Sequence, residues 1–317
     1  MGWQPAATLD RLRQRAALLA HVRDFFCGRG VLEVETSLLC SSGITDPSIE
    51  PLRVQCGQSI TGTRFLQTSP EYAMKRLLAA GSGPIYQVAK AFRDGEAGPR
   101  HNPEFTLLEW YRPGFDHHQL MREVADLVLS YLGTQPVEYH AYRALFQQEL
   151  GVDPLTAELD TLQSVARAEL DVGGLSGDRD LWLDLLMSHL IEPRLIGRGL
   201  CFVYDYPESQ AALARVSEVD GMSVGHRFEL YVNGLELANG YWELGDAVEQ
   251  RRRFVADNQR RCVAGQNEQP LDEHLLAALA AGMPDCAGVA LGLDRLLMLG
   301  AGCEDIRQTL AFDWSRS

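Results

Sequence analysis

Two glutamates flank the strongest turn signal in this sequence. Asn233-Gly234 separates two strand-like runs, which is typical of a two-residue β-hairpin. Such a turn would pair Glu229 with Ala238 and bring the carboxylates of Glu229 and Glu236 to one face, about 7–8 Å apart, where one divalent cation could bridge them. Because two carboxylates without a basic partner repel each other, the pattern favours a metal-binding pair over a solvated acidic face.

A long polar loop joins two further predicted strands, residues 84–93 and 105–111. Long loops between rigid strands often hold a ligand. Side chains alternate along a strand, so Phe105, Glu109 and Tyr111 would share one face. A ring, a carboxylate and a phenol on one face are unusual for a protein core. This segment alone is equally compatible with a ligand site and with an exposed sheet face.

A strand with an almost bare face precedes the last predicted helix. Gly288, Ala290 and Gly292 have the same parity along this strand. A strand face this bare usually lets another group approach the backbone closely. Arg295 would lie at the start of the helix that follows. The alternative interpretation is tight packing of the strand against the helix, with an exposed arginine.

The elements that must position these residues can be predicted from apolar spacing and turn residues. Helices are expected at residues 9–28, 68–80 and 115–132, through most of 134–200, and after residue 293; further strands are expected at 31–36, 61–67, 201–204 and 287–291. Strands near both ends, helices between them and no regular βαβ alternation predict an α+β fold: a mostly antiparallel β-sheet flanked by helices.

Composition excludes several classes of protein. The chain has 317 residues, 46% of them apolar, which is enough for a large core, and it contains no apolar run long enough to cross a membrane. A net charge of −14 argues against non-specific binding to nucleic acid. Seven cysteines and eight histidines without metal-ligand spacing predict reduced thiols and no zinc site, with His117-His118 in a solvated turn. The first residues lack a secretory signal, so a cytoplasmic protein is expected.

Taken in chain order, the polar-loop segment, the Asn233-Gly234 hairpin and the bare strand resemble the catalytic unit of the class II aminoacyl-tRNA synthetases. Arg93 and Phe105 resemble the second signature motif of that family, residues 292–295 the third, and residues 11–36 the first, which forms the dimer interface. Residues 100–106 and 236–244 are similar to the lysyl subclass. Two departures occur: Gly95 stands where the second motif has Glu, which is shifted to Glu96, and Ser37 replaces the usual Pro of the first motif.

The first motif begins almost at residue 10, so the anticodon-binding domain of a lysyl-tRNA synthetase is expected to be absent. The sequence most resembles the family of truncated lysyl-tRNA synthetase paralogues that attach (R)-β-lysine to a lysine of translation elongation factor P. Residues 69–72, 108–113 and 204–207 are similar to that family, as is Ala290, where the true synthetases have Gly. The resemblance implies one catalytic domain over residues 1–317, with a mainly helical insertion around 134–200.

The resemblance also implies a reaction and a set of site residues. The reaction is ATP-dependent, AMP-forming ligation: adenylation of (R)-β-lysine with release of pyrophosphate, then transfer to the ε-amino group of a lysine on elongation factor P. Implied requirements are ATP, Mg²⁺, a lysine-like amino acid and a homodimer, with no tRNA and no membrane. The implied catalytic residues are Arg93, Glu236 and Arg295. ATP would contact Arg93, Asp94, Gly95, His101, Asn102, Phe105, Glu236, Leu237, Gly292 and Arg295. The amino acid would contact Ser69, Pro70, Glu71, Glu109, Tyr111, Asn239, Glu243 and Ala290, and the metal Glu229 and Glu236.

Some alternatives remain open at this point. The chain could adenylate α-lysine for another small or carrier acceptor, or it could be a non-catalytic regulatory paralogue; retention of Arg93, Glu229, Glu236 and Arg295 favours an enzyme. Glu71 could simply belong to a capping box with Thr68. Glu243 could be a surface residue. The basic runs 251–253 and 260–261 are expected to form a solvated helix face.

Overall fold

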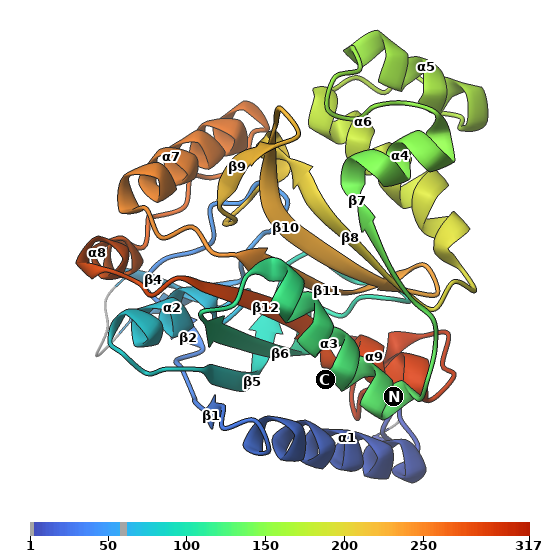
Figure 1. Cartoon of the computed structure of the whole chain (residues 1–317). Coiled ribbons are helices and arrows are strands. Elements are labelled where there is room, and N and C mark those ends of the chain that lie inside the picture. Colours follow the sequence, from blue (N-terminus) through green and yellow to red (C-terminus); the bar gives the residue numbers. More distant parts are fainter. Residues whose placement is uncertain (1–2, 58–61) are drawn as a thin grey trace. The chain divides into compact units, whose positions relative to one another are not determined.

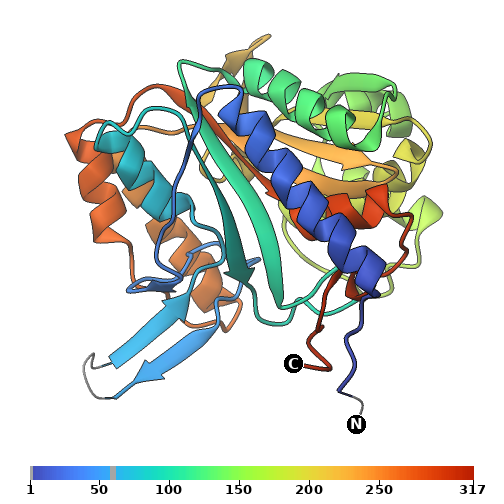
Figure 2. The same ribbon diagram turned by 90° about the horizontal axis from the view of Figure 1, so that it is seen from below.

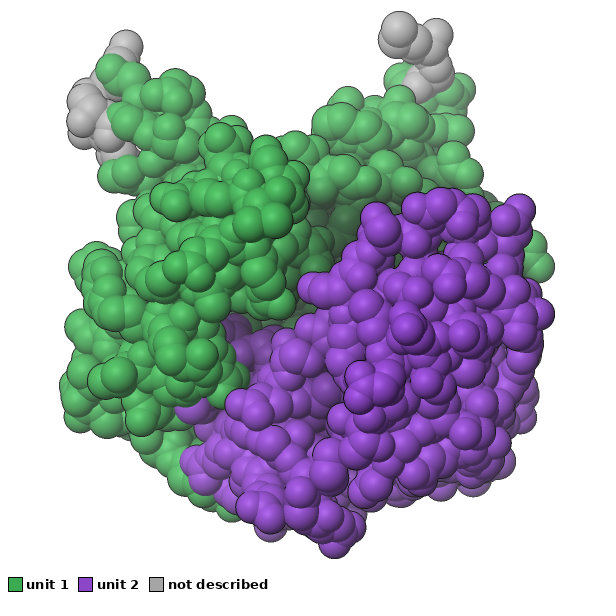
Figure 3. All heavy atoms as spheres, turned by 90° about the horizontal axis from the view of Figure 1, so that it is seen from above, with its two compact units in different colours: residues 1–115, 126–133, 245–317 green, residues 116–125, 134–244 purple. Residues whose placement is uncertain are grey.

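A computed structural model describes residues 3–57 and 62–317 of the chain (Figure 1). The chain divides into two units, which are coloured separately in Figure 3. Unit 1 comprises Met1–Phe115, Asp126–Gly133 and Gly245–Ser317, and unit 2 comprises Asp116–Ala125 and Thr134–Leu244. Each of the three segments predicted to carry the chemistry lies entirely within one unit: the polar loop and the bare strand in unit 1, and the Asn233-Gly234 hairpin in unit 2.

The sheet of unit 1 is built around the two strands predicted on either side of the polar loop. Its order is β1 (Leu32–Glu33), β5 (Ile85–Phe92), β6 (Glu104–Pro113) and β12 (Cys286–Gly292). The β1–β5 pair is parallel, whereas β5–β6 and β6–β12 are antiparallel. The long strands therefore confirm the predicted antiparallel arrangement, although the strand expected at 31–36 is only two residues long.

The predicted first helix, α1 (Leu9–Cys27), covers one face of this sheet, as Figure 2 shows. It begins after Thr8, whose hydroxyl accepts a hydrogen bond from the backbone N–H of Arg11. Phe26 stacks on Tyr86 of β5 at a ring separation of 4.4 Å and meets Trp110 of β6 edge-on at 5.3 Å. These contacts fix α1 against the strands that carry the polar loop.

The rest of unit 1 consists of a small sheet and short helices. The small sheet has the order β2 (Leu39–Cys40), β4 (Gly62–Leu66) and β3 (Arg53–Cys56), and the helices are α2 (Glu71–Ala79), α7 (Ala247–Val263), α8 (Glu273–Ala281), α9 (Leu293–Gly300) and the 3₁₀ turn η4 (Ile306–Thr309). Thr61, the first residue of the strand expected at 61–67, lies outside the described residues. On α7, Arg251, Arg252 and Arg260 are exposed as expected. Arg253 is half-buried, and Arg261 is fully buried and donates to backbone carbonyls.

Unit 2 has its own strands and a helical layer. The strand order is β11 (Leu235–Trp242), β10 (Met222–Val232), β8 (Leu200–Pro207) and β7 (Val137–Ala141), with β9 (Val216–Val219) also paired to β10. The helical elements are α3 (His117–Leu132), whose last residues belong to unit 1, and α4 (Tyr142–Leu150), α5 (Leu159–Glu169), α6 (Arg179–Leu186), η1 (Met187–Ile191), η2 (Glu192–Leu195) and η3 (Glu208–Gln210). Trp182 and Phe146 are fully buried where α4–α6 pack on β8. The helices expected between 134 and 200 are thus present.

The predicted β10–β11 hairpin is present, with one change of register. Asn233 and Gly234 both have positive φ, 52° and 68°, as a two-residue turn of this kind requires. Tyr231 pairs with Glu236 as predicted, but Glu229 pairs with Asn239 instead of Ala238. The cause is a β-bulge that leaves one extra residue in β11 between these two pairs.

Two composition-based expectations can also be compared with the structure. None of the helices in residues 3–57 and 62–317 combines the length and the apolar character that a membrane span requires. None of the seven cysteines, all of which lie in the described part of the chain, is joined in a disulfide. The expectation of a solvated turn at His117-His118 is wrong, because both residues begin helix α3 and His117 is buried; only His118 is exposed.

Candidate active site

The carboxylate of Glu109 lies at the centre of a buried cluster in unit 1. The phenol of Tyr111, two residues further along β6, donates a hydrogen bond of 2.8 Å to Oε1, which confirms that the two side chains share a face. The hydroxyl of Ser69 donates one of 2.6 Å to Oε2. Burial, and after it the negative charge of Glu71, raise the pKa of Glu109 to about 8. The free protein therefore holds Glu109 mainly as a neutral acid at pH 7.

The bare strand face lies directly beside this acid. Ala290 pairs with Glu109 across the β6–β12 ladder, and Gly288 pairs with Tyr111. Directly paired residues project from the same face of a sheet. On β12, therefore, no side chain larger than the methyl group of Ala290 lies beside the Glu109 carboxyl. Small residues at such positions are of the kind that lets a ligand approach a strand backbone closely.

The positively charged side chain of Lys75, which the sequence analysis did not single out, lies in the same region. Lys75 is only 1% exposed, and its Nζ donates a hydrogen bond of 2.6 Å to Oε1 of Glu71, one helical turn earlier in α2. Helix α2 begins at Glu71 with Pro70 as the capping residue, so the capping box with Thr68 does not form. The hydroxyl of Ser69 accepts the Glu71 N–H instead, at 3.0 Å. The i, i+4 spacing was the available sequence signal for the Glu71–Lys75 pair.

The polar loop holds the first of the two arginines that are expected to contact ATP. The guanidinium carbon of Arg93 lies 5.0 Å from the centroid of the Phe105 ring, and Nη1 lies 3.6 Å from the carboxylate of Glu96. Gly95 adopts a φ of 79°, a conformation in which glycine is strongly preferred. The shift of the glutamate from position 95 to 96 thus coincides with a glycine turn, and it places the carboxylate beside Arg93.

The second arginine, Arg295, lies against the other end of the loop. Its Nη2 is 2.7 Å from Nε2 of His101, and its Nε donates to the carbonyl of Arg100 at 3.3 Å. Burial, followed by the charge of Arg295, lowers the pKa of His101, so that its imidazole is neutral at pH 7. A neutral imidazole can accept a hydrogen bond from Arg295 while its other nitrogen donates to a ligand.

Asn102 supports the loop through its own side chain. Its Nδ2 donates to the carbonyl of Glu104 at 2.7 Å, and its Oδ1 accepts the N–H of Trp314 at 3.0 Å. The family resemblance implies that Asn102 contacts ATP. In the structure both ends of its amide bind the chain itself, so this side chain ties the loop to the C-terminal segment.

Three polar residues position the start of β6 and were not predicted as a group. Arg15 of α1 donates to Asp294 at 2.6 Å and to the hydroxyl of Thr106 at 2.7 Å. Asp294, in the first turn of α9, also accepts the backbone N–H of Thr106 at 2.7 Å. This network joins α1, β6 and α9, and it holds the neighbours of Phe105 and Arg295 in place. Its members lie far apart in the sequence, and spacing alone gives no signal for it.

In unit 2, Glu229 has partners that the sequence argument did not anticipate. Its Oε1 contacts the guanidinium of Arg227, and its Oε2 accepts hydrogen bonds from the phenols of Tyr231 and, at 2.8 Å, Tyr206. The premise that the Glu229–Glu236 pair lacks a basic partner is therefore wrong. A carboxylate offers about four lone-pair positions, so one remains on Glu229 for a cation. With the half-buried Glu236 on the same hairpin, this donor set fits Mg²⁺, which takes one or two carboxylates and completes its shell with phosphate and water.

The remaining predicted amino-acid contacts from unit 2 lie on and after β11. Glu243 is 1% exposed, so the alternative that it is a surface residue is wrong; its backbone forms a bridge with Ala214. Asn239 pairs with Glu229, and its side-chain Oδ1 is buried without a hydrogen-bond partner in the described part of the chain. Leu237, which is expected to contact ATP, is the extra residue at the hairpin bulge and is buried.

Each unit thus contains a distinct part of the predicted site. Unit 1 contains the Glu109 cluster, the Arg93–Phe105 pair and the Arg295–His101 pair, together with Asp94, Gly95, Asn102, Ala290 and Gly292. Unit 2 contains Glu229, Glu236, Leu237, Asn239 and Glu243. Two arginines with forked donors suit phosphate oxygens, an aromatic ring suits a nucleobase, and buried carboxyls suit ammonium groups.

Comparisons with known proteins agree with this chemistry. A family model described as "tRNA synthetases class II (D, K and N)" matches residues 4–315. Curated relatives from Salmonella paratyphi B, Salmonella heidelberg and Salmonella enteritidis PT4 are each 47% identical to the chain over 321 aligned residues. The alignments cover 99% of this chain and 98% of each relative, and each relative carries the name elongation factor P–(R)-β-lysine ligase. Because the family model matches almost the whole chain and the fold is α+β with a mostly antiparallel sheet, this chain belongs to the class II tRNA synthetase family of the D, K and N type.

Proposed function

We propose that this chain is an ATP-dependent ligase that adenylates (R)-β-lysine and transfers it to the ε-amino group of a lysine on translation elongation factor P. The observation that carries the proposal is 47% identity over almost the full length of relatives with that name. The Glu109 cluster beside the bare β12 face supports a lysine-like substrate, because a buried carboxyl needs a cationic partner once it is ionised.

In the first step, the carboxylate of the amino acid attacks the α-phosphorus of ATP and pyrophosphate leaves. The attacking carboxylate is already ionised at pH 7, so the reaction requires no general base. Catalysis then consists of positioning and charge neutralisation. We assign Arg93 to the α-phosphate and His101 to the terminal phosphates. Phe105 and Arg295 would sandwich the adenine between a ring and a guanidinium. Asp94, Gly95, Leu237 and Gly292 would border the nucleotide.

Mg²⁺ would be held by Glu236 and the remaining lone pair of Glu229, and it would neutralise charge on the phosphates. Arg227 contacts the carboxylate of Glu229 and fixes its orientation. In the second step, the ε-amino nitrogen of the acceptor lysine attacks the acyl carbon of the adenylate. AMP leaves, an amide bond forms, and the nitrogen releases a proton to solvent.

For the amino acid, the structure supports a division of roles in unit 1. Glu109 would bind one ammonium group, with Ser69 and Tyr111 holding its carboxyl in place. Glu71 would contribute partial negative charge, moderated by Lys75. Pro70 and Ala290 would shape the walls, and we assign Asn239 and Glu243 of unit 2 to the second ammonium group.

We also propose a homodimer. The outward side of α1 carries Ala16, Ala17 and Ala20, all exposed, and Leu32 and Leu39 after it are 57% and 38% exposed. Small and apolar residues on one helix surface are suited to close packing against a second copy. Analytical ultracentrifugation at micromolar concentration should show twice the monomer mass for the wild type and the monomer mass for Ala20→Arg. A monomeric wild type would contradict the proposal.

The function is tested by intact-mass measurement of elongation factor P after incubation with the full-length protein, Mg²⁺ and ATP. With (R)-β-lysine we expect elongation factor P to gain the mass of one lysyl residue, which requires ATP. α-Lysine in its place should give a much slower gain. Efficient charging of tRNA, or no modification of elongation factor P with either amino acid, would contradict the proposal.

A further inference from the structure

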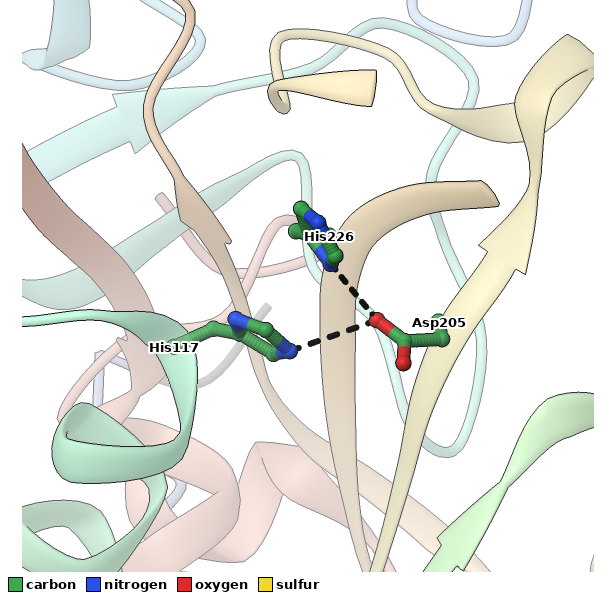
Figure 4. Close-up of side chains that lie close together, drawn as sticks. All are labelled: His117, Asp205 and His226. Carbon is green, nitrogen blue, oxygen red and sulfur yellow. Dashed lines mark hydrogen bonds and ion pairs between the residues drawn. The ribbon is translucent and has the colours of Figure 1, made fainter. Parts of the chain in front are cut away.

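Three side chains with metal-ligating atoms meet inside unit 2, apart from the groups described above. His117 is the first residue of α3, Asp205 lies in β8 and His226 in β10 (Figure 4). Nε2 of His117 is 3.3 Å from Oδ1 of Asp205, and Nδ1 of His226 is 2.8 Å from the same oxygen. The three potential ligand atoms all lie within 4.8 Å of one another.

The two separations to Asp205 are close to those between neighbouring ligands of a small dication, and the two imidazoles would move together where their own separation exceeds this value. With zinc–ligand distances of about 2.0–2.1 Å, two ligand atoms at adjacent corners of a tetrahedron are about 3.3 Å apart. The His117–Asp205 separation already has this value. The His226–Asp205 pair would have to open by about 0.5 Å, because the metal replaces a hydrogen bond.

The imidazole of His117 is buried without a regular hydrogen bond to any described residue. The residue is 3% exposed, and neither ring nitrogen makes a hydrogen bond of regular geometry with any described residue, although Nε2 points at Asp205. Its other close neighbours are rings: His118 at 4.1 Å, His226 at 4.7 Å and Trp242 at 6.2 Å between centroids. Burying a polar nitrogen without a partner costs stability, and a metal ion at Nε2 would remove that cost.

The second imidazole is already oriented as metal-bound histidines usually are. While Nδ1 of His226 faces Asp205, its Nε2 lies 2.6 Å from the hydroxyl of Ser217 in β9. Metal-binding histidines nearly always donate their other ring N–H to a nearby oxygen, which fixes the tautomer. A register shift between Gly225 and Phe228 in β10 contains His226 and turns this part of the strand toward Asp205.

From these observations we infer that His117, Asp205 and His226 form a binding site for one transition-metal dication, best matched by Zn²⁺, with one coordination position left for water. Two imidazoles and one carboxylate suit zinc, whereas Mg²⁺ takes oxygen ligands only, so the site differs in kind from the Glu229–Glu236 pair. Its ligands come from the start of α3, from β8 and from β10. The bound ion would join these elements, and its role is structural.

The inference is tested by metal binding to the full-length protein after removal of metals with a chelator. With thiols kept reduced, equilibrium dialysis with Zn²⁺ should give one tightly bound ion per chain. Substitution of a ligand should weaken this binding at least 100-fold, since even the outer-shell partners of a metal site contribute about 10–100-fold. His117→Gln and Asp205→Asn are the two test variants. His118→Gln is the matched control, because His118 is the exposed neighbour of His117 and should leave binding unchanged.

Two further measurements separate this site from binding by cysteines and from misfolding. Co²⁺ in place of Zn²⁺ should give visible d–d absorption without sulfur-to-metal charge transfer. Zn²⁺ should raise the Tm of the wild type and His118→Gln but not of His117→Gln or Asp205→Asn, all four being first confirmed as folded by circular dichroism. Absence of stoichiometric binding, a thiolate signature in the cobalt spectrum, or equal affinity in the ligand variants would overturn the inference.

Discussion

Two buried glutamates, one in each unit, are held in opposite ways. Glu109 accepts its hydrogen bonds from two neutral hydroxyls, those of Ser69 and Tyr111, and its pKa is raised by burial. Glu229 contacts the guanidinium of Arg227 in addition to two phenols. Among the residues that the structure describes, none forms an ion pair with Glu109 that must break before a cationic ligand binds. Glu229 is already paired with Arg227, so its carboxylate is held in one position and is suited to bind a metal ion there.

Removing the charge of Glu229 should have the largest effect on stability. Glu229→Gln would leave the guanidinium of Arg227 without its ionic partner in a largely buried site, at a cost of about 3–5 kcal/mol in the free energy of unfolding. Urea unfolding monitored by circular dichroism measures this loss. Glu218→Gln, an exposed change in the neighbouring strand β9, is the control and should cost less than about 0.5 kcal/mol. Equal stability of Glu229→Gln and the wild type would show that the ion pair is dispensable.

The same substitution at Glu109 should spare stability and remove function. Glu109→Gln deletes a charge-assisted bond to the ammonium group, so kcat/KM for amino-acid-dependent pyrophosphate exchange should fall about 100-fold, with ATP affinity unchanged. Glu104→Gln, on the same strand but exposed, should retain full activity. If ATP affinity and amino-acid use fall together, Glu109 is structural and the assigned pocket is wrong.

The pH dependence of stability should also separate the two acids. Because the folded-state pKa of Glu109 is raised to about 8, the stability associated with its neutral form is present below the unfolded pKa and is lost as pH rises through about 8. Glu109→Gln cannot ionise, so it should lose less stability than the wild type between pH 7 and 9. Identical pH profiles from urea unfolding would contradict the raised pKa.

A smaller effect is expected at the wall of the Glu109 cluster. Ala290 pairs directly with Glu109, so its methyl group lies where the substrate amine would approach. We expect Ala290→Gly to raise activation of α-lysine relative to (R)-β-lysine by about tenfold, within the 1–3 kcal/mol that one methyl group can contribute. Ala287→Gly, on the opposite face of β12, is the control. If the ratio of α-lysine to (R)-β-lysine activation is unchanged in Ala290→Gly, then Ala290 does not determine specificity.

The comparison also shows where sequence reasoning succeeds. The shared face of Glu109 and Tyr111 follows from the two-residue period of a strand, and the β10 hairpin follows from the conformational preference of Asn233-Gly234. These rules are local, because they depend on residues a few positions apart. The signature segments then identify the family, since their order and spacing carry more information than any one of them.

Partners that come from elsewhere in the chain were missed. The phenol that Tyr206 offers to Glu229 comes from β8, so no spacing in the sequence signals it. Arg227 is different, because the two-residue period of a strand places it on the same face as Glu229. The bulge in β11 changed the register by one residue without a proline or glycine at the site to signal it. His117, Asp205 and His226 come from three separate elements, so their spacing resembles no metal motif even though their side chains converge.

The most direct test of the contrast between the two acids is the number of protons released when the amino acid binds. A bound ammonium favours the ionised form of Glu109, so its raised pKa must fall, and at pH 7 the protein should release close to one proton. Isothermal titration calorimetry with (R)-β-lysine and a non-hydrolysable ATP analogue, repeated at pH 7 in buffers of different ionisation enthalpy, measures this number. We predict close to one proton released by the wild type and close to none by Glu109→Gln. Proton uptake, or the same release from both proteins, would contradict the account.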